Sequence, residues 1–299
     1  MSSAVQHTHA SVDRPGRKTR SRRDYAVALP VWAAPAIAAL TLLFAVPLAH
    51  NAWQSLTKEE ATADAFFYYR KIISDPYYRG VLFETLSVSF IVTVLCLLLS
   101  YPVAYYLARH ARRSRSAILF LLVAPLLTSV IMRTLGIRLI LAKQGLLNAL
   151  LDTVSLGPIP PSLLNGPFSV YVGIIHVLIP FMVLSITPVI QRIEPAIEES
   201  AVILGAGALR TFWHVTLPLS REGIYTGCIL VFMMSNGSFI TQLMLGAGKV
   251  VTMPVLIFQQ FNVTQDTAFA GAMGNMLLIM TIVCLAIQSL LISRSRRPQ

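Results

Sequence analysis

The residues with the most distinctive chemistry lie in one short stretch between two long apolar runs. Residues 198–220 read EESAVILGAGALRTFWHVTLPLS. Two adjacent acids, Glu198 and Glu199, precede two glycines and an apolar, aromatic segment that contains Leu217 and Pro218. Acids and apolar side chains on a turn-forming segment suit the binding of a partner protein, and they do not form a catalytic constellation. The stretch therefore indicates recognition rather than catalysis.

Local signals predict two short helices joined by a turn within residues 191–221. Pro195 fits the first turn of a helix, where its missing N–H costs nothing. Gly205 and Gly207 allow the backbone to stop and reverse. We expect a second short helix through ALRTFWHV that ends before Pro218. A self-packed elbow accounts for part of this pattern, but a docking site for a soluble partner better accounts for the segment's length and exposure.

Polar side chains inside the apolar runs form the second group of candidates, because an ionisable group in a membrane is costly. If its run is one helix that starts near Ala117, Arg133 lies roughly 24 Å along it, at about 1.5 Å per residue. Arg133 fits either a structural hydrogen-bonding role or a role in cargo passage. His176 fits an interhelical partner. The same two roles are open for the polar residues of the fifth run, which are Asn236, Ser238, Thr241 and Gln242.

Other potentially reactive residues give no catalytic pattern. GAGK at residues 246–249 resembles a phosphate-binding loop, but the first glycine and the hydroxyl residue after the lysine are missing. Cys96, Cys228 and Cys284 all fall inside apolar runs, which suits packing better than a disulfide set or a metal site. We therefore expect neither a cofactor nor a metal in this chain.

The elements that must position these residues are long apolar helices. The 299-residue chain is 55% apolar and 12% charged, whereas soluble domains carry about a quarter charged residues. Its apolar runs are about 20 residues long, enough to cross about 30 Å of hydrocarbon as a helix. The sequence predicts an all-α polytopic membrane protein with six transmembrane helices. The runs lie near 30–52, 81–108, 117–142, 168–190, 222–245 and 268–292.

The placement of positive charge predicts the orientation of these helices. The net charge is +11, and basic residues gather before the first run, after the second, after the fourth and after the sixth. By the positive-inside rule, both termini and the 191–221 loop lie in the cytoplasm. An RNA-binding tail is the alternative for residues 14–23, but they lack interleaved aromatics. We expect cytoplasmic tails at 1–28 and 294–299 around a transmembrane domain at 29–293.

The 198–220 stretch resembles the EAA loop of membrane subunits of binding-protein-dependent ABC importers. In that family the loop reads Glu-Ala-Ala, three residues, Gly, nine residues, Ile, any residue, Leu-Pro. Two positions depart conservatively, with serine for alanine and valine for isoleucine. The matching residues are Glu199, Ser200, Ala201, Gly205, Val215, Leu217 and Pro218.

The remaining membrane part is similar to the spermidine/putrescine-type permeases of that family. The similarity is carried by YPVAYYLAR, APLLTSVIMRTLGIRLIL, GPFSVYVGIIHVLIPFMVL and SNGSFITQLMLGAG. Gln242 stands where family members often have proline. The broad family handles polyamines, opines, iron carriers and aminophosphonates, so the motifs leave the cargo open.

The resemblance implies a type I ABC importer permease fold in the bacterial inner membrane. Two permease subunits, usually different chains, would form the path for a small polar solute, with two ATP-binding subunits beneath and a periplasmic binding protein above. Glu198 and Glu199 would pair with basic groups of an ATPase, and Gly205 would set the elbow angle. ATP would bind the ATPase, so this chain would be no enzyme, and no nucleic-acid partner is expected.

Two other classes of protein compete with this interpretation. A secondary transporter working without an ATPase would want ion-coupling groups at the membrane midplane and inverted repeats, and neither is visible. A membrane-embedded enzyme would need a catalytic constellation.

A path for polyamines should offer carboxylates or aromatic faces. Glu84 is the acid within a run, near its outer end, so this subunit alone gives no support for a cationic cargo.

Overall fold

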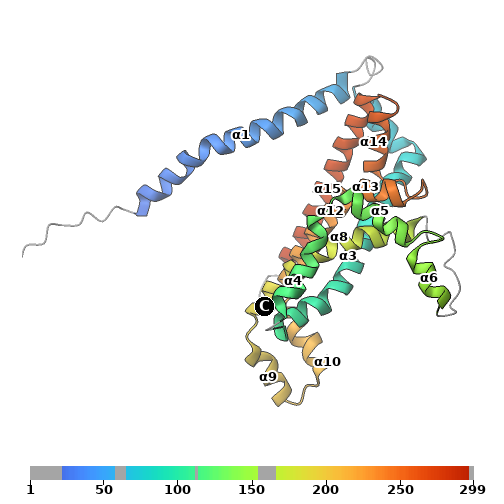
Figure 1. Ribbon diagram of the computed structural model, residues 1–299. Coiled ribbons are helices and arrows are strands. Elements are labelled where there is room, and N and C mark those ends of the chain that lie inside the picture. Colours follow the sequence, from blue (N-terminus) through green and yellow to red (C-terminus); the bar gives the residue numbers. More distant parts are fainter. Residues whose placement is uncertain (1–21, 58–64, 112–113, 154–165, 296–299) are drawn as a thin grey trace, which may run out of the picture. The chain divides into compact units, whose positions relative to one another are not determined.

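A computed structural model describes residues 22–57, 65–111, 114–153 and 166–295, and the regular elements of this part are all helices (Figure 1). The chain divides by its contacts into two units, residues 1–50 and residues 51–299. Helix α1 (Arg22–Thr57) begins in the first unit and ends in the second. The predicted tails at 1–28 and 294–299 lie largely outside the described residues.

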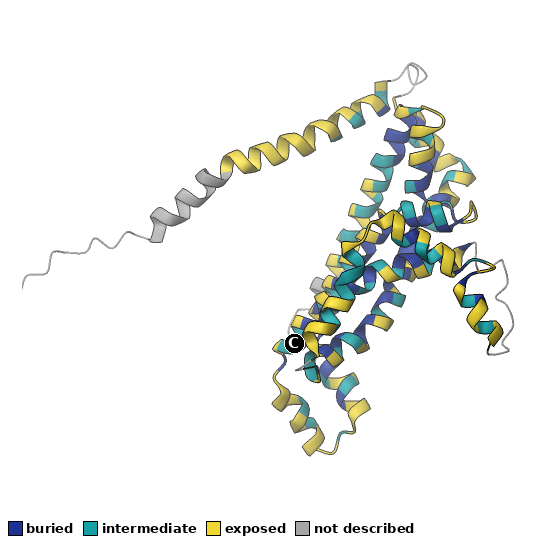
Figure 2. Cartoon of the chain, in the orientation of Figure 1, coloured by how far each residue is buried: buried dark blue, intermediate teal, exposed yellow. Residues whose placement is uncertain are grey.

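Three long helices form the core of the second unit: α3 (Pro76–Arg109), α8 (Pro167–Arg192) and α12 (Arg221–Asn236). Buried apolar side chains fill the space between them, and exposed ones cover the outer faces, as Figure 2 shows. Apolar side chains on the outer faces, where a soluble protein carries polar ones, suit helices that lie in lipid. The largest buried members are Leu107, Ile174, Met182, Ile186 and Ile190.

Two glycines let α12 approach α8 closely. A Cβ atom on Gly227 would lie 2.5 Å from the sulfur of Met182, and one on Gly223 would lie 3.0 Å from Val189. Small residues four apart are a common device for close packing of membrane helices. The spacing of Gly223 and Gly227, four residues apart, therefore has a packing reason.

A second apolar cluster joins four helices at the end of the bundle that carries α14. It contains residues of α2 (Phe67–Ser74), α3, α14 (Met253–Asn262) and α15 (Thr267–Ser295). Phe269 is packed between two tyrosines, with ring centroids 5.5 Å from Tyr68 and 5.3 Å from Tyr78. Tyr68 and Tyr78 are therefore part of the apolar core at this end of the bundle.

The prediction of six continuous spans is confirmed only in part. Within the described residues, four helices are long and apolar enough to cross a membrane, or five if a bent pair counts as one span. In the third run, α4 (Arg115–Val123) and the 3-10 turn η2 (Ala124–Leu127) meet α5 (Val130–Ile140) at an angle of 101°. The bend follows Pro125, and extended backbone at Thr128 and Ser129 separates the two pieces.

The fifth run is also broken. Helix α12 ends at Asn236 after 16 residues, and α13 (Ile240–Leu245) has only six. Gly237 caps the end of α12, and Ser238 and Phe239 connect the two pieces. The mean hydropathy of the run does not reveal the break, although polar residues such as Asn236 and Ser238 lie beside it.

Five short elements complete the described part. Helix α6 (Leu146–Thr153) follows α5. The segment between α8 and α12 contains α9 (Pro195–Ile203), α10 (Ala208–Thr211), the π-helical turn η3 (Phe212–Thr216) and α11 (Leu217–Leu219). In Figure 1, α9 and α10 lie at the end of the second unit opposite to α14.

Candidate functional site

The α8–α12 segment reverses direction at Gly205. Helix α9 begins with Pro195 at its first position, as predicted, and ends at Ile203. Gly205 has a φ of +88°, and the next two bonds, Gly205 N–H to Val202 O and Ala206 N–H to Ala201 O, complete a Schellman turn. Nothing lies within 4 Å of a Cβ built on Gly205, so the backbone conformation is what requires glycine. Gly207 has a φ of −66° and has no such requirement.

The second half of the segment differs from the prediction, because its helix does not end before Pro218. Helical backbone continues from Ala208 through η3 and α11 to Leu219. The N–H of Leu217 bonds to the carbonyl of Phe212, five residues back. This wider turn precedes Pro218, which has no N–H to donate to the normal helical acceptor.

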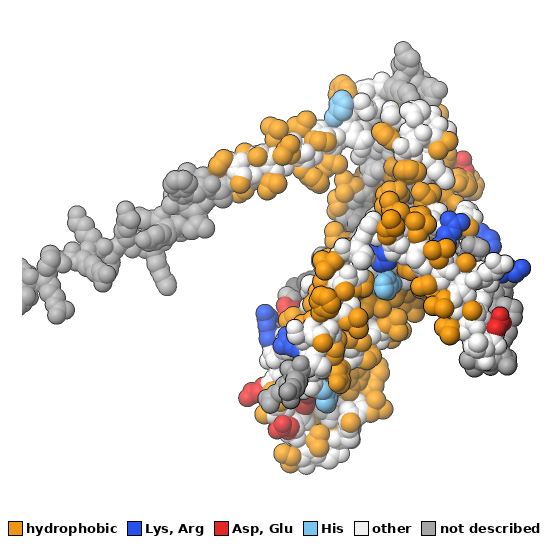
Figure 3. Space-filling view, in the orientation of Figure 1, with side chains coloured by type: hydrophobic (Ala, Val, Ile, Leu, Met, Phe, Trp, Pro, Cys, Tyr) orange, Lys and Arg blue, Asp and Glu red, His pale blue; other side chains and the backbone are white. Residues whose placement is uncertain are grey.

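The turn between α9 and α10 presents large apolar side chains to the outside. We call residues 202–209 the tip. Ile203 is 85% exposed, Leu204 88% and Leu209 73%. Figure 2 shows this end of the second unit as largely exposed, and Figure 3 shows apolar side chains there beside acidic ones. An exposed apolar patch with a polar border is typical of a protein–protein interaction site.

The other end of α9 is tied to the bundle by one carboxylate. Arg109, at the end of α3, contacts Glu198 twice: Nη2 donates to Oε1 at 3.1 Å, and Nε lies 3.1 Å from Oε2. Oε1 also accepts a hydrogen bond of 2.8 Å from the hydroxyl of Thr216. Arg109 further donates to the carbonyl of Ile193 at 3.0 Å. We call Arg109, Ile193, Glu198 and Thr216 the base.

A second contact holds α3 against the start of α12. The hydroxyls of Tyr101 and Ser220 are 2.8 Å apart and both residues are buried. The ring of Phe212 stands edge-on to Tyr101 at 5.4 Å between centroids. The segment therefore rests on α3 at two places, through Glu198 and through Phe212 and Ser220.

The adjacent acids Glu198 and Glu199 have different surroundings in the structure. Glu198 is engaged within the chain, so the expectation that it pairs with a partner does not fit its surroundings. Glu199 is exposed. The other motif positions divide in the same way: Ser200 and Pro218 are exposed, Ala201, Val215 and Leu217 are half-buried.

Three of the five predicted path residues line one cavity of about 270 Å³. Arg133, Ser238 and Thr241 face it together with apolar residues of α8. Arg133 lies on α5, beyond the 101° bend, so the estimate of its depth along a straight helix was wrong. Its Nη1 donates to the carbonyl of Pro125, across the bend.

The remaining two path candidates are interhelical links. Asn236 accepts a hydrogen bond of 3.1 Å from Ser89 on α3 and donates one of 3.3 Å to Thr281 on α15. Gln242 accepts from the hydroxyl of Thr252 and is buried. His176 is exposed on α8 in this single chain, and its role as an interhelical partner stays a prediction.

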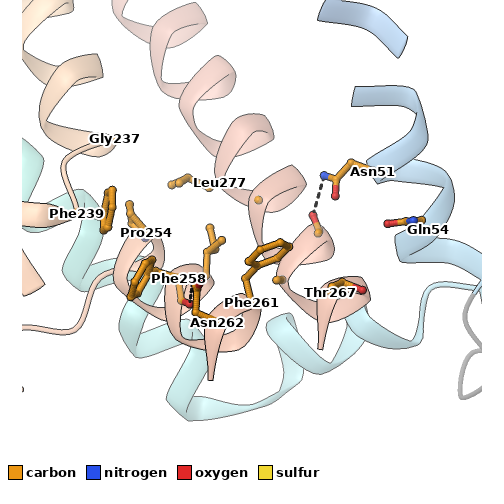
Figure 4. Close-up of a pocket in the computed structure, with 14 residues that line it drawn as sticks. Asn51, Gln54, Gly237, Phe239, Pro254, Phe258, Phe261, Asn262, Thr267 and Leu277 are labelled. Atoms are coloured by element: carbon orange, nitrogen blue, oxygen red, sulfur yellow. Dashed lines mark hydrogen bonds between the residues drawn. The ribbon is translucent and has the colours of Figure 1, made fainter. Parts of the chain in front are cut away.

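A second cavity, of about 620 Å³, was not found from the sequence (Figure 4). It lies between the ends of α1 and α12, α14 and α15, and it shares Gly237 and Phe239 with the smaller cavity. Phe239 and Phe258 stack at 5.4 Å, and Phe261 lies on the same helix as Phe258. None of its described lining residues is ionisable.

Hydrogen bonds fix two walls of this cavity. The N–H of Met253, at the start of α14, donates to the hydroxyl of Thr85 on α3 at 2.9 Å. At the end of α1, Asn51 donates to Asn275 at 3.0 Å, and Asn275 donates to the hydroxyl of Tyr69 at 3.0 Å. The isolated asparagines in apolar runs were the signal that could have revealed this network.

Comparison with known proteins identifies the group to which these features belong. The profile of the family described as binding-protein-dependent transport system inner membrane component matches residues 100–297. The chain is 33% identical over 213 residues to the spermidine/putrescine transport system permease protein PotB of Escherichia coli, covering 69% of this chain and 78% of that protein. It is 32% identical over 200 residues to PotB of Haemophilus influenzae, covering 67% and 70%.

Solved structures share the fold at low sequence identity. A bacterial ABC transporter involved in the import of the acidic polysaccharide alginate matches with a TM-score of 0.75 and 15% identity, over 92% of this chain and 98% of that one. The MetNI methionine ABC transporter, in an inward-facing conformation, matches with a TM-score of 0.54 and 13% identity, over 79% and 100%. The chain belongs to the family of binding-protein-dependent transport system inner membrane components.

Proposed function

We propose that this inner-membrane chain is one permease subunit of an ATP-driven importer and forms half of its translocation path. The observation that carries the proposal is the tip: Ile203, Leu204 and Leu209 are exposed on a segment held firmly by Gly205 and by the base. Side chains of this kind gain stability when a partner covers them. The partner is a soluble ATPase, which binds and hydrolyses ATP.

The two broken helices complete a six-crossing, type I arrangement with cytoplasmic termini. In this arrangement α4, η2 and α5 together make the third crossing, and α12 and α13 make the fifth. Broken backbone within a membrane is tolerated where protein covers it or where it lines a cavity. Both breaks border the 270 Å³ cavity, at Arg133 and at Ser238.

The cargo that we propose is a small polar solute of the polyamine class, as the names of the PotB relatives suggest. The large cavity supports this choice, because aromatic faces attract alkylammonium groups and its described lining carries no competing charge. Arg133, Ser238 and Thr241 line the inner part of the path, while Asn236 and Gln242 hold its walls. A second, homologous permease would supply the other half, and a periplasmic binding protein would deliver the cargo.

The partners can be tested by purification of the tagged chain in a gentle detergent, with mass spectrometry of the co-purifying proteins. The proposal predicts an ATP-binding subunit and a second multi-span permease in the eluate. A chain that remains alone after crosslinking in membranes would contradict the proposal and favour a secondary transporter.

The cargo assignment predicts that the aromatic face of Phe239 is needed for uptake. Phe239→Leu should lower the initial rate of labelled spermidine uptake by about tenfold, because a desolvated cation–π contact contributes up to about 2 kcal/mol. Phe83→Leu is the matched control, since Phe83 is 73% exposed on α3. Equal uptake by the two variants would contradict a cation path beside Phe239.

A further inference from the structure

The guanidinium of Arg109 connects parts of the chain that are far apart in sequence. Arg109 ends α3, and its partners Ile193 and Glu198 flank the start of α9. The two contacts to Glu198 use different nitrogens and different oxygens, both at 3.1 Å. The Nη2 contact is a hydrogen bond, whereas the Nε contact is an ion-pair distance without hydrogen-bond geometry. One charge-assisted hydrogen bond and the attraction of opposite charges therefore join the two groups.

The carboxylate of Glu198 adds a third segment to this connection. Its Oε1 accepts the hydroxyl of Thr216 at 2.8 Å, and Thr216 closes the π-helical turn before Pro218. The side chains of Arg109 and Glu198 are only 11% and 15% exposed. Water therefore screens the pair far less than it screens a surface pair, and the contact resists separation of α9 from α3.

Without this contact, α9 would be joined to the bundle mainly through its chain ends. One end follows α8 at Ile193, and the other passes Gly205 and the tip before it reaches α12. Gly205 is a turn, and it transmits force poorly compared with a packed helix. A load applied at α9 would then reach α3 only indirectly, through Phe212 and through the packing of α12 against α3.

We propose that Arg109 and Glu198 form a latch that passes movement of α9 directly to α3. Arg109 and Glu198 are positioning residues in this account, and neither touches cargo or ATP. The inference rests on the proposed function, because the movement originates in an ATPase that binds the tip. In this proposal Glu198 transmits the movement of α9 to α3, and the neighbouring, exposed Glu199 contacts the ATPase.

The latch can be tested in the assembled complex of both permeases and the ATPases, reconstituted with and without its binding protein. The variant is Arg109→Met combined with Glu198→Leu, because apolar replacement of both partners leaves no buried charge unpaired. Arg115→Gln is the control: Arg115 also bonds across to α8, to Gln191 at 3.1 Å, but at an exposed position. The readouts are the ATPase retained per permease and the stimulation of ATP hydrolysis by the binding protein, per assembled complex.

The unchanged complex and the Arg115→Gln complex should show stimulation in the usual range of coupled sites, about 5-fold to about 150-fold. The double variant should retain its ATPase but lose stimulation to below about twofold. A structural role alone would lower the amount of complex and leave the stimulation of each complex unchanged. That second result would overturn the latch.

Two further measurements keep the test decisive. If the double variant does not assemble, Glu198→Gln serves instead, since it removes the charge and keeps an oxygen for Thr216; unchanged stimulation would again overturn the latch. Arg109→Lys should recover part of the stimulation, because it restores the positive charge but not the planar guanidinium that also bonds to Ile193. An unchanged chain that retains no ATPase would overturn the proposed function and the latch with it, a result distinct from failure of the latch alone.

Discussion

The base and the tip of the α8–α12 segment have opposite surroundings although they are only a few residues apart. At the base, Glu198 is shielded and meets Arg109 and Thr216 of the same chain. At the tip, the side chains of Ile203 and Leu204 are more than four-fifths exposed. The base therefore belongs to the fold of this subunit, and the tip has the properties of a surface made for another protein.

The difference is clearest between Glu198 and Glu199. Successive residues of an α-helix point about 100° apart, so neighbours in sequence can face the bundle and the outside. A motif shared with a family identifies the segment but not the direction of each side chain. Substitutions that affect one region and spare the other test whether the tip and the base have separate roles.

The largest effect is expected at the tip. Ile203→Asp combined with Leu204→Asp should reduce retention of the ATPase by about 30-fold or more, because a central interface residue contributes about 2 kcal/mol or more. The melting temperature of the chain should stay unchanged, since both side chains are already exposed. Pull-down and thermal unfolding of the same preparation measure both quantities. Normal retention would show that the tip is not the docking surface.

A smaller effect is expected at the turn that holds the tip. Gly205→Ala forces a Cβ atom into left-handed backbone at a cost of about 1–2 kcal/mol. ATPase retention should therefore fall by about tenfold. Gly207→Ala is the matched control, because Gly207 has ordinary extended backbone and open space around it. If both variants behave alike, the shape of the turn does not matter for docking.

The smallest effect is expected at the contact between α3 and the start of α12. Tyr101→Phe removes the hydroxyl that lies 2.8 Å from Ser220, which should cost about 1 kcal/mol. The expected result is a decrease of about 2–4 °C in melting temperature. ATPase retention should not change. A loss of retention without a loss of stability would mean that the Tyr101–Ser220 contact also takes part in binding the ATPase.

The sequence predicted the elements whose signals are local. Pro195 at the start of α9 and the reversal at Gly205 are confirmed, and both depend on single-residue backbone preferences. The all-helical fold followed from apolar runs that are long enough to span. Pro125 lies just before the bend in the third run, but the 101° angle was not predicted from the sequence.

Features that depend on contacts between distant segments could not be predicted. The break after Asn236 is invisible to hydropathy, and the helix through Pro218 persists because a π-helical turn precedes the proline. Asn236 and Gln242 are interhelical links because they accept hydrogen bonds from Ser89 and Thr252, which lie far away or in another element of the chain. The aromatic cavity at Phe239 needs the connection between α12 and α13 to lie beside α14, and no local pattern specifies that arrangement.

The most direct test compares a tip variant and a base variant in the same complex. The complex is purified with the Ile203→Asp, Leu204→Asp tip variant and, separately, with the Arg109→Met, Glu198→Leu base variant. ATPase retention and binding-protein stimulation are then determined for each. We predict that only the tip variant loses the ATPase, and that the base variant keeps it but loses stimulation. The same loss of retention in both variants would contradict the division of this segment into a docking tip and a transmitting base.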